Sequence, residues 1–482
     1  MFGKKSNFIN GAWVEGEGEI ININPSDTND VIDTYSNASS KQLNDAVSAA
    51  QKAQKNWEKV GIEKRANILH DIGNELIKQS KEIGTLLSRE EGKTLPEGIG
   101  EVIRSGQQFQ YYAASALRQF GENIASTREG VSVEMTREPV GVCGIISPWN
   151  FPIAIAAWKS APAMAFGNAV VLKPASQTPA SAIALTKIIS DQKDIPDGLF
   201  NLVLGGGGTI GQQISGHKDI NAISFTGSVG VGQTIYMEAA KSMKKMQLEM
   251  GSKNPLVVMD DADLDIAVAC ATNGAYGGTG QKCTASSRLI VHEKVYKEFI
   301  EKLIENLKGL KVGHALEEGS QMGPVSSETQ LHSNLDYIEI GKKEAKLAYG
   351  GNPMNMRTPG HYMEPTLFID GNNKTTINQE EMFGPIACVI PVKSYEEGLE
   401  VANDTIFGLS SGIITQSLSK AADFKKNIKT GVTTVNLPTA GLDYHVPFGG
   451  RKASSFGPRE QGTYAHEFFT HVKTTYVSPG KI

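Results

Sequence analysis

Five short apolar runs between residues 142 and 260 decide the fold: VCGIIS (142–147), AVVLK (169–173), LFNLVLG (199–205), AISFTG (222–227) and PLVVMD (255–260). Each run is rich in Val, Ile and Leu, and helix-length stretches of sequence separate the runs. Such alternation is typical of βαβ units, whose parallel strands are covered on both faces by the connecting helices. The region therefore predicts a mostly parallel sheet within an α/β fold.

The sequence on both sides extends this pattern. Residues 41–118 place apolar side chains at spacings of three and four, which predicts amphipathic helices. After residue 260, further strand-like runs and a helix-like segment, 293–311, indicate a second α/β lobe. Its runs are SRLIVH (287–292), PTLFID (365–370), ACVIPV (387–392) and SGIITQ (411–416). The β-prone stretch 468–477 is expected to pair within the fold or with a partner chain.

Composition argues against several classes of protein. The chain has 482 residues, which suggests two or three domains, and its 40 % hydrophobic and 21 % charged residues are typical of a soluble globular protein. A net charge of −5 without long runs of either sign argues against binding to nucleic acid or to anionic lipid. The longest apolar stretch, 151–172, contains Lys159 and two prolines and is too broken to span a membrane.

The amino terminus and the cysteines indicate a compartment. The first residues, MFGKKSNFINGAW, contain no apolar signal segment. Four cysteines are too few to form a disulfide framework in so long a chain. We therefore expect reduced thiols and a cytoplasmic protein.

Cys283 is the candidate nucleophile. It lies in a bend rich in Gly, Ser and Thr, GGTGQKCTASSR (277–288), where nearby backbone N–H groups favour a thiolate. The alternative is a small, buried hydrophobic residue. Cys143, Cys270 and Cys388 lie in apolar surroundings and are expected in the core.

Two polar residues are candidates to complete a catalytic site. Glu249, in MQLEMGSKNP, could activate water as a general base, or it could be a solvated side chain of a helix or loop. Asn150, in ISPWNFP, follows an apolar strand. Its amide could donate to a developing oxyanion, or the residue could be an ordinary turn asparagine beside proline.

Two glycine-rich junctions suggest nucleotide binding. In LVLGGGGTIGQQI, Gly206, Gly208 and Gly211 satisfy G-x-G-x-x-G between a strand and an expected helix, and Gly227 begins a similar junction in SFTGSVGVGQTI. Lys173 ends a strand on the carboxyl side, where ligands lie in open α/β sheets, unless it is a surface lysine. The residues alone thus favour a two-lobed enzyme that uses a nucleotide and has a candidate catalytic thiol.

Seven motifs, taken in order, carry a resemblance to a known family. PWNFP, LKPAS, FTGS, LEMGSKNP, GQKC, EEMFGP and PFGG together resemble the aldehyde dehydrogenase superfamily, over residues 8–477. The resemblance implies an aldehyde dehydrogenase-like α/β fold with a Rossmann-like cofactor domain, a catalytic domain and a small β bridging element. It also implies NAD(P)-dependent oxidation of an aldehyde to a carboxylic acid.

The resemblance assigns roles to the catalytic candidates. Cys283 would attack the aldehyde, and the Asn150 amide and the Cys283 backbone N–H would hold the oxyanion of the thiohemiacetal. After hydride transfer to the nicotinamide, Glu249 would activate the water that hydrolyses the thioester. Lys159 and Glu460 would form a proton path to that base.

The resemblance also implies a set of cofactor residues. Glu381 and Phe383 match residues that hold the nicotinamide ribose and ring. The other cofactor positions are Trp149, Lys173, Ser176, Gly207, Gly211, Gly227 and Ser228. Ser176 stands where many NAD-preferring members carry a glutamate, which would repel a 2′-phosphate. NADP is therefore expected, with NAD as the alternative if serine merely relaxes the preference.

The substrate side is similar to one branch of the family. GQKCTASSR, VNLPTAGLDYHVPFGGRKASS and GPREQG together look most like the branch that acts on 2-oxoglutarate semialdehyde (2,5-dioxopentanoate). The distal carboxylate of this substrate needs a cation, and Arg104 falls where the family lines its substrate tunnel, unless it forms a surface salt bridge. Lys282 and His445 are further candidates. Succinic semialdehyde dehydrogenase and a broad-specificity aldehyde dehydrogenase are the alternatives.

Two other classes are weighed against this interpretation. A non-catalytic binding or structural protein on the same scaffold would not need Cys283, Asn150 and Glu249 together. Acyltransferase relatives, which release the acyl group to coenzyme A, commonly lack the glutamate at the position of Glu249. Hydrolysis is therefore expected.

The resemblance also implies an architecture. We expect an NAD(P)-binding domain from residues 1–121 and 138–251, a catalytic domain from 252–450, and a bridging element from 122–137 and 451–482. In the family this element pairs with another subunit, so a homodimer or homotetramer is expected. No His/Cys spacing suggests a metal site.

Overall fold

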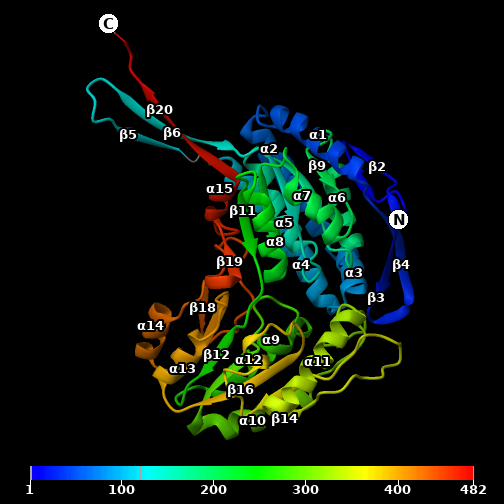
Figure 1. Cartoon of the computed structure of the whole chain (residues 1–482), viewed down its shortest axis with the longest axis vertical. Helices are drawn as coiled ribbons and strands as arrows, with labels where there is room; N and C mark the ends of the chain where they lie inside the picture. Colours follow the sequence, from blue (N-terminus) through cyan, green and yellow to red (C-terminus); the bar gives the residue numbers. More distant parts are fainter. Residues whose placement is uncertain (1–2, 119–120, 481–482) are drawn as a thin grey trace.

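The computed structural model describes residues 3–118 and 121–480, which form an upper lobe, a lower lobe and a projecting β arm (Figure 1). In this part of the chain an eight-stranded sheet forms the upper lobe, in the order β19-β11-β10-β7-β8-β9-β1-β2. The strands from β11 to β9 in this order run parallel, whereas β19, β1 and β2 pair antiparallel at the edges. The bounds are β1 Asn7–Ile9, β2 Ala12–Val14, β7 Val142–Ile146, β8 Ala169–Lys173, β9 Phe200–Leu202, β10 Ala222–Thr226, β11 Lys245–Glu249 and β19 Ser455–Phe456.

Four of the five apolar runs lie in this sheet, and the fifth does not. Every residue of β7 and β8 is buried, as expected for strands that are covered on both faces. PLVVMD instead forms β12 (Pro255–Val258) in the sheet of the lower lobe. The strand that pairs with β10 on this side is β11. Its sequence, KMQLE, contains Lys, Gln and Glu, so a search for apolar runs does not find it.

The predicted helices of residues 41–118 are confirmed. They are four helices, α1 Ser40–Trp57, α2 Ile62–Lys78, α3 Ser80–Glu91 and α4 Leu95–Ala116. Reciprocal capping boxes begin α1 at Ser39 and α4 at Thr94. The upper lobe also contains α5 Ala154–Ala165, α6 Pro179–Ser190, a π-helical turn at Gly207–Gly211, α7 Gln212–Gly216 and α8 Val229–Ala240.

The lower lobe has its own sheet, in the order β14-β15-β16-β13-β12-β17-β18. Its strands are β13 Arg288–His292, β14 Lys346–Tyr349, β15 Thr366–Ile369, β16 Ile386–Val392, β17 Ser410–Ile414 and β18 Val432–Val435, besides β12. Its helices are α9 Leu264–Tyr276, the 3₁₀ turn Gly277–Gly280, α10 Glu293–Lys308, α11 Glu328–Glu344, α12 Thr376–Gln379, α13 Tyr395–Asn403 and α14 Leu418–Asn427. The two sheets bury separate apolar clusters, which confirms the expected pair of α/β lobes.

Residues 451–480 belong to two structures, the arm and the upper lobe. The arm consists of β5 Glu122–Ala125, β6 Ser132–Pro139 and β20 Thr470–Val477, in the order β20-β6-β5. The predicted strand at 468–477 therefore pairs within the chain, along β6. Residues before β20 form β19, two 3₁₀ turns (Lys452–Ser454 and Thr463–Ala465) and α15 (His466–Phe469), and β19 extends the upper sheet rather than the arm.

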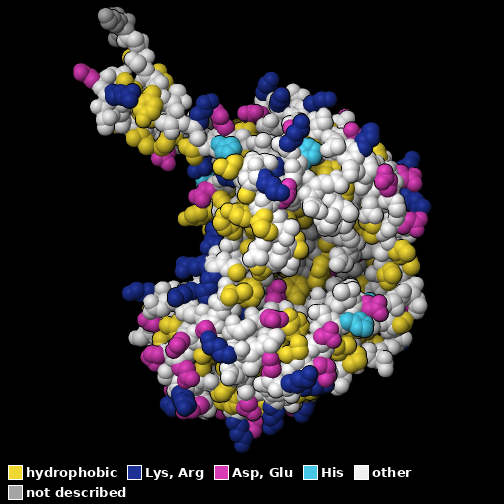
Figure 2. Space-filling model, viewed as in Figure 1, with side chains coloured by type: hydrophobic (Ala, Val, Ile, Leu, Met, Phe, Trp, Pro, Cys, Tyr) yellow, Lys and Arg dark blue, Asp and Glu magenta, His cyan; other side chains and the backbone are white. Residues whose placement is uncertain are grey.

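Two further features complete the outline. A hairpin of β3 (Glu17–Asn24) and β4 (Asp27–Asn37) lies against α3 of the upper lobe and reaches the lower lobe at Pro359, on the side opposite the arm (Figure 1). Figure 2 shows the surface hollowed between the lobes on the side below the arm, with Lys and Arg side chains around the hollow.

Candidate functional site

Four of the predicted site residues lie at the carboxyl ends of neighbouring parallel strands. Asn150 follows β7, Lys173 ends β8, Gly227 follows β10 and Glu249 ends β11. The ends are level, because Ile146 pairs with Lys173 and Thr226 pairs with Glu249. The order of the connections reverses between β7 and β10, and ligands bind at such switch points.

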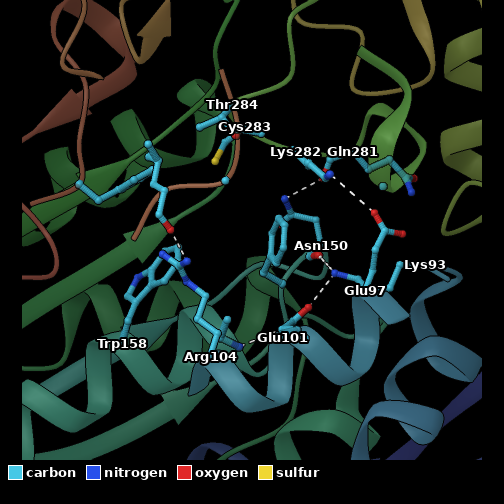
Figure 3. Close-up of a pocket in the computed structure, with 18 of the residues that line it drawn as sticks. Lys93, Glu97, Glu101, Arg104, Asn150, Trp158, Gln281, Lys282, Cys283 and Thr284 are labelled. Atoms are coloured by element: carbon cyan, nitrogen blue, oxygen red, sulfur yellow. Dashed lines mark hydrogen bonds and ion pairs between the residues drawn. The ribbon is translucent and has the colours of Figure 1, made fainter. Parts of the chain in front are cut away.

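Cys283 lies between two cavities and lines both. The larger, of about 410 Å³, is here named the α4 cavity, and Figure 3 shows the sulfur pointing into it. Its lining includes Glu97, Glu101, Arg104, Asn150, Trp158, Lys282, Phe448 and Gln461. The second, of about 220 Å³, is named the β10 cavity. Its lining includes Trp149, Asn150, Thr226, Gly227, Ser228, Glu381 and Phe383.

The loop that carries Cys283 depends on its glycines. Gly278, Thr279 and Gly280 all have positive φ, at 60°, 56° and 66°, so the chain makes a tight left-handed bend. A Cβ at Gly280 would lie 2.1 Å from the carbonyl oxygen of Gly384, so only glycine fits there. On the other side of the loop, Asn254 Nδ2 donates to the carbonyl oxygen of Cys283 at 2.8 Å.

The surroundings of Cys283 favour the protonated thiol. Burial is the largest cause of a raised pKa of Cys283, and the negative charges of Glu249 and Glu381 add to it. Together they bring the pKa to about 12. A base or a nearby cation is therefore needed before this sulfur can act as a nucleophile. The other cysteines, Cys143, Cys270 and Cys388, are buried and unpaired, as predicted.

Asn150 is buried beside Cys283, and its side chain is fixed. Its Nδ2 donates to the carbonyl oxygen of Gln281 at 2.9 Å. An amide nitrogen has two hydrogens, so one remains available to another acceptor.

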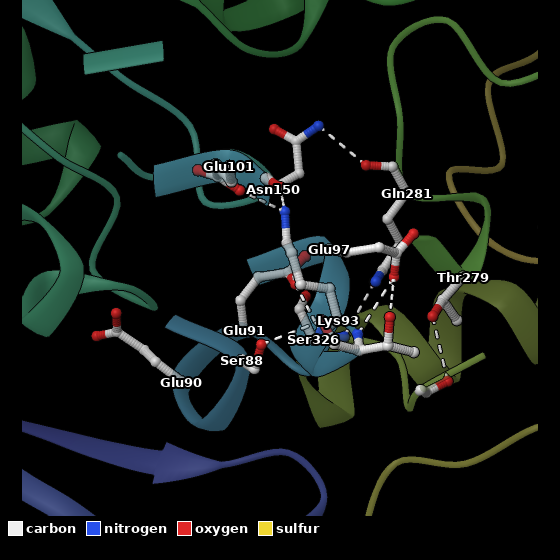
Figure 4. A network of polar contacts seen from close by, with 12 residues as sticks. Ser88, Glu90, Glu91, Lys93, Glu97, Glu101, Asn150, Thr279, Gln281 and Ser326 are labelled. Atoms are coloured by element: carbon white, nitrogen blue, oxygen red, sulfur yellow. Dashed lines mark hydrogen bonds and ion pairs between the residues drawn. The ribbon is translucent and has the colours of Figure 1, made fainter. Parts of the chain in front are cut away.

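A buried ion cluster holds the backbone of Asn150 (Figure 4). Lys93 Nζ donates to the carbonyl oxygen of Asn150 at 2.6 Å and to Glu101 Oε2 at 2.7 Å. Glu101 Oε1 accepts the N–H groups of Ile153 and Ala154, at 3.0 and 3.1 Å, where α5 begins. Sequence reasoning missed Lys93 and Glu101, which together fix the turn that presents the Asn150 amide.

Glu249 is 3 % exposed, so the alternative of a solvated side chain is wrong. Its Oε2 accepts the hydroxyl hydrogen of Ser455 at 2.5 Å. Burial, and then the charge of Glu460, raise the pKa of Glu249 well above its ordinary value. A carboxyl group whose pKa is raised in this way is suited to accept a proton near neutral pH.

Lys159 and Glu460, predicted to act together, form a buried ion pair. Lys159 Nζ also lies 2.7 Å from Ser224 Oγ, which in turn donates to Gln247 Oε1 at 2.8 Å. Glu460 Oε2 has no hydrogen-bond partner among the described residues. Glu460, which has one oxygen without a hydrogen bond, therefore lies close enough for its charge to act on Glu249.

Five predicted cofactor residues line the β10 cavity: Trp149, Gly227, Ser228, Glu381 and Phe383. The rings of Trp149 and Phe383 meet edge to face, with centroids 5.4 Å apart. Glu381 Oε1 accepts the Ser252 N–H at 2.8 Å, and burial raises the pKa of Glu381 to about 7.

The other cofactor candidates lie outside this cavity. A Cβ at Gly211 would lie 3.4 Å from Lys173 Cε, so these two residues are in contact, and Gly207 begins the same π-helical turn. Ser176 donates its hydroxyl to the carbonyl oxygen of Gly205 at 3.3 Å. Burial lowers the pKa of Lys173 to about 8.

The three substrate candidates differ in their surroundings. Arg104 lines the α4 cavity and donates to the carbonyl oxygen of Leu442 and, at 3.5 Å, to Gln461 Oε1. Burial lowers the pKa of Arg104, and the charge of Asp443 opposes this shift, but no carboxylate of the described residues lies within ion-pair distance of the guanidinium, so a surface salt bridge is not its role. Lys282 lines the cavity but lies 3.6 Å from Glu97 Oε1. His445 is exposed and lines neither cavity.

The sequence pattern of the aldehyde dehydrogenase family matches residues 13–475. This chain belongs to the aldehyde dehydrogenase family. It is 42 % identical over 480 residues to the alpha-ketoglutaric semialdehyde dehydrogenase of Bacillus subtilis strain 168, a match that covers 98 % of each chain. Betaine aldehyde dehydrogenase from Staphylococcus aureus, solved in complex with NAD⁺, is 31 % identical with a TM-score of 0.96, covering 99 % of this chain and 96 % of that one. An E. coli NADP-dependent enzyme is 31 % identical with a TM-score of 0.95, covering 99 % and 98 %.

As an aldehyde dehydrogenase, the protein is an oxidoreductase that acts on small aldehydes, in a family that uses NAD(P). The resemblance seen in the ordered motifs is confirmed, and so is the expected fold. Among residues 3–118 and 121–480, no helix is both long and apolar enough to cross a membrane. The same residues contain no group of three or more His, Cys, Asp or Glu placed to hold a metal ion.

Proposed function

We propose that this aldehyde dehydrogenase oxidises 2-oxoglutarate semialdehyde to 2-oxoglutarate. The observation that carries the proposal is Arg104, a cation that lines the α4 cavity and has no carboxylate partner among the described residues. Lys93 and Lys282, which line the same cavity, each lie near a glutamate. An unpaired guanidinium in a partly buried cavity favours an anionic ligand. The names of relatives such as the Bacillus subtilis enzyme agree with an acidic semialdehyde.

In the first half of the proposed reaction the Cys283 thiol first loses its proton to water. The sulfur of the resulting thiolate, from which each turnover starts, then bonds to the aldehyde carbon and forms a thiohemiacetal. The free N–H of the Asn150 amide and the Cys283 backbone N–H hold the oxyanion. Lys93 and Glu101 keep that amide in place through the backbone of Asn150. When NAD⁺ or NADP⁺ is bound, it supplies the two-electron acceptor that converts the thiohemiacetal to a thioester.

In the second half Glu249 takes a proton from water, and the resulting hydroxide attacks the thioester carbon. The carbon–sulfur bond breaks, the carboxylic acid leaves and Cys283 regains its thiolate. Lys159 and Glu460 then carry the proton of Glu249 away through the buried pair. The sum is one aldehyde, one water and one oxidised cofactor converted to one acid, one reduced cofactor and a proton.

The β10 cavity fits the nicotinamide end of a dinucleotide. Thr226 Oγ1 is buried there without a partner among the described residues, and Ser228 begins α8 without capping it, so the first N–H groups of this helix remain open to phosphate. Trp149, Glu381 and Phe383 would hold the nicotinamide ribose and ring, and Lys173, Ser176, Gly207 and Gly211 the adenosine end.

The preferred cofactor is proposed to be NADP. Ser176 replaces the carboxylate that would repel a 2′-phosphate, and Lys173 lies three residues before it. We expect Ser176→Glu to lower kcat/KM for NADP⁺ at least tenfold while kcat/KM for NAD⁺ stays the same or rises. Equal loss with both cofactors would contradict the preference.

The arm is proposed to join subunits into a homodimer or homotetramer. The outer edge of β20 is unpaired in the described chain, and Ile124, Val472 and Tyr476 are exposed apolar residues on the arm. Figure 2 shows hydrophobic side chains on the projecting arm. Sedimentation velocity should find an oligomer that Val472→Lys with Tyr476→Lys dissociates, whereas a wild-type monomer would refute this assignment.

The substrate is tested with initial rates for 2-oxoglutarate semialdehyde, succinic semialdehyde and a neutral aldehyde of similar length, in the wild type and in Arg104→Ala. We expect the wild type to prefer the two acids, and the variant to lose at least tenfold in kcat/KM for them while the neutral aldehyde is spared. Equal rates for acidic and neutral aldehydes in the wild type would exclude the semialdehyde assignment.

A further inference from the structure

Gln461 lies next to the proposed carboxylate-binding residue and is held rigidly. It is 1 % exposed and lines the α4 cavity. Its φ of 59° lies in the left-handed region that residues other than glycine rarely adopt. The preceding residue, Glu460, exchanges both backbone hydrogen bonds with Phe448, at 2.7 and 2.9 Å. This pairing anchors the segment that points the Gln461 side chain into the cavity.

The hydrogen bonds of Gln461 fix which end of its amide is the oxygen and which is the nitrogen. Its Oε1 accepts from Gln108 Nε2 at 2.9 Å and from Arg104 Nη2 at 3.5 Å. Gln108 Nε2 also donates to the carbonyl oxygen of Tyr444 at 3.0 Å, so this atom must be the nitrogen. Arginine has no acceptor, and exchanging the two ends of the Gln461 amide would set donor against donor.

The nitrogen of the same amide has no partner. Gln461 Nε2 is buried and makes no hydrogen bond with any described residue. A buried donor without an acceptor is costly, and a cavity that keeps one is suited to a ligand that supplies the acceptor. The donor belongs to the amide whose oxygen accepts from Arg104 at 3.5 Å, so the two residues are neighbours in the lining of this cavity.

We propose that Gln461 Nε2 binds the 2-oxo group of the substrate while Arg104 binds the adjacent carboxylate. A 2-oxo acid presents a ketone oxygen and a carboxylate on neighbouring carbons, which matches two neighbouring donors. Gln461 thereby selects 2-oxo acids over semialdehydes that have only a carboxylate. This inference rests on the proposed function, since it needs the acidic end of the substrate at Arg104.

The inference is tested with two aldehydes of equal length, 2-oxoglutarate semialdehyde and glutaric semialdehyde, which lacks the ketone. Their kcat/KM values are measured with the full-length enzyme and saturating NADP⁺ for the wild type, Gln461→Met and Gln461→Glu. We expect the ratio of the two values to fall about tenfold in Gln461→Met, by loss of one hydrogen bond. In Gln461→Glu the added negative charge weakens binding of both substrates, because both carry a carboxylate. The amide N–H is lost as well, so the same fall in the ratio of kcat/KM values is expected. This second variant keeps the test decisive if the methionine variant is unstable.

Two further variants locate the effect. Trp158→Phe removes another buried N–H of the α4 cavity that has no partner among the described residues, and the ratio should stay at its wild-type value. Gln110→Met removes an amide of the same type from α4 at a position where it donates to Asn74 Oδ1 at 2.8 Å, outside the α4 cavity, and should also leave the ratio unchanged.

The outcomes separate this inference from the proposed function. A wild type that prefers the ketone-bearing aldehyde, with a ratio unchanged in both Gln461 variants, overturns the inference and leaves the proposed function standing. A fall of the ratio in Trp158→Phe instead would assign the ketone to Trp158. Equal values for the two aldehydes in the wild type overturn the inference, and the comparison of acidic with neutral aldehydes decides the proposed function separately.

Discussion

Two buried ion clusters of the same composition flank Cys283 and Asn150, and they differ in how their carboxylates are bonded. The clusters are Lys93 with Glu91 and Glu101, and Lys159 with Glu249 and Glu460. In the first, Glu101 accepts two backbone N–H groups of α5, and Glu91 Oε2 accepts the Lys93 N–H at 2.9 Å. In the second cluster, Glu249 accepts a hydrogen bond from one hydroxyl group, that of Ser455. The Oε2 atom of Glu460 has no partner among the described residues.

The difference in hydrogen bonding suits the Lys93 cluster to fixing the backbone and the Lys159 cluster to transferring a proton. Backbone N–H groups have fixed positions, so they hold the Glu101 side chain in place beside Lys93. A carboxylate with few donors, placed beside another carboxylate, binds a proton more readily, which agrees with the raised pKa of Glu249. Burial also raises the pKa of Glu91, to about 7, so the contrast lies between Glu101, which two backbone N–H groups hold, and Glu249. We therefore expect the first cluster to position the backbone and the second to transfer protons.

The largest expected effect is that of Glu249→Gln. Glutamine cannot accept a proton, so kcat should fall about 10³-fold, whereas thioester formation continues. Stopped-flow mixing should therefore show about one equivalent of reduced cofactor per active site, followed by a slow steady state. A variant that shows no burst, or that keeps its steady-state rate, would remove Glu249 from the hydrolytic step.

Lys93→Met is expected to act mainly on stability. The variant leaves Glu91 and Glu101 buried without their cation, and breaking a buried pair from one side costs about 3–5 kcal/mol. Urea denaturation should show this loss, and Lys93→Arg, which keeps the charge, should recover most of it. A loss below about 1 kcal/mol would mean that the cluster does not hold the fold of this turn.

Lys159→Met is expected to change the pH profile. Its positive charge lowers the pKa of Glu249 and so opposes the effect of burial. Because the base form of Glu249 appears as pH rises, kcat should rise with pH in the wild type. Without the lysine this rise should move to higher pH by about one unit. A profile that stays in place, measured at saturating substrate, would disconnect Lys159 from the base.

The smallest expected effect concerns the thiol itself. The pKa of about 12 predicts that alkylation of Cys283 by iodoacetamide, in the enzyme without added cofactor, rises close to tenfold per pH unit between pH 7 and 9. The charge of Glu249 helps to raise this pKa, so Glu249→Gln should alkylate a few-fold faster at a given pH. A slower reaction would show that Glu249 assists the thiol as a base instead.

The sequence predicted those parts of the fold whose physical cause is local. β7, β8, β10 and β13 are mostly apolar because both faces of a parallel sheet are buried, so each was visible as a run. β11 was not, since its Lys245 and Gln247 find partners only in the folded chain: Lys245 Nζ donates to the carbonyl oxygen of Thr470 at 2.7 Å, and Gln247 contacts Ser224. Chain-distant partners of this kind leave no periodic signal.

The same distinction holds for the site: residues in sequence motifs were predicted, and residues that depend on chain-distant partners were missed. Cys283, Asn150 and Glu249 stand in motifs whose order carries the resemblance. The structure places Asn150 and Glu249 at strand ends beside the switch point of the upper sheet, and Cys283 comes from the lower lobe and lines a cavity together with Asn150. Lys93 lies in the short connection between α3 and α4, and Glu101 lies in α4, in a stretch where charged residues are most often solvated. The one available signal was the spacing from Lys93 to Glu101 beside the capping box of α4, and it does not distinguish a buried pair from an exposed one.

The meeting of the two cavities at one sulfur has a consequence for inhibitor selectivity. Residues of the β10 cavity lie in motifs shared through a family that must hold a common dinucleotide, whereas Arg104 and Gln461 belong to the α4 cavity alone. A compound that fills the α4 cavity and ends in a thiol-reactive group would reach Cys283 from that side only. Such a compound would label this enzyme in the presence of saturating cofactor, and its discrimination among related dehydrogenases would depend on its anionic end.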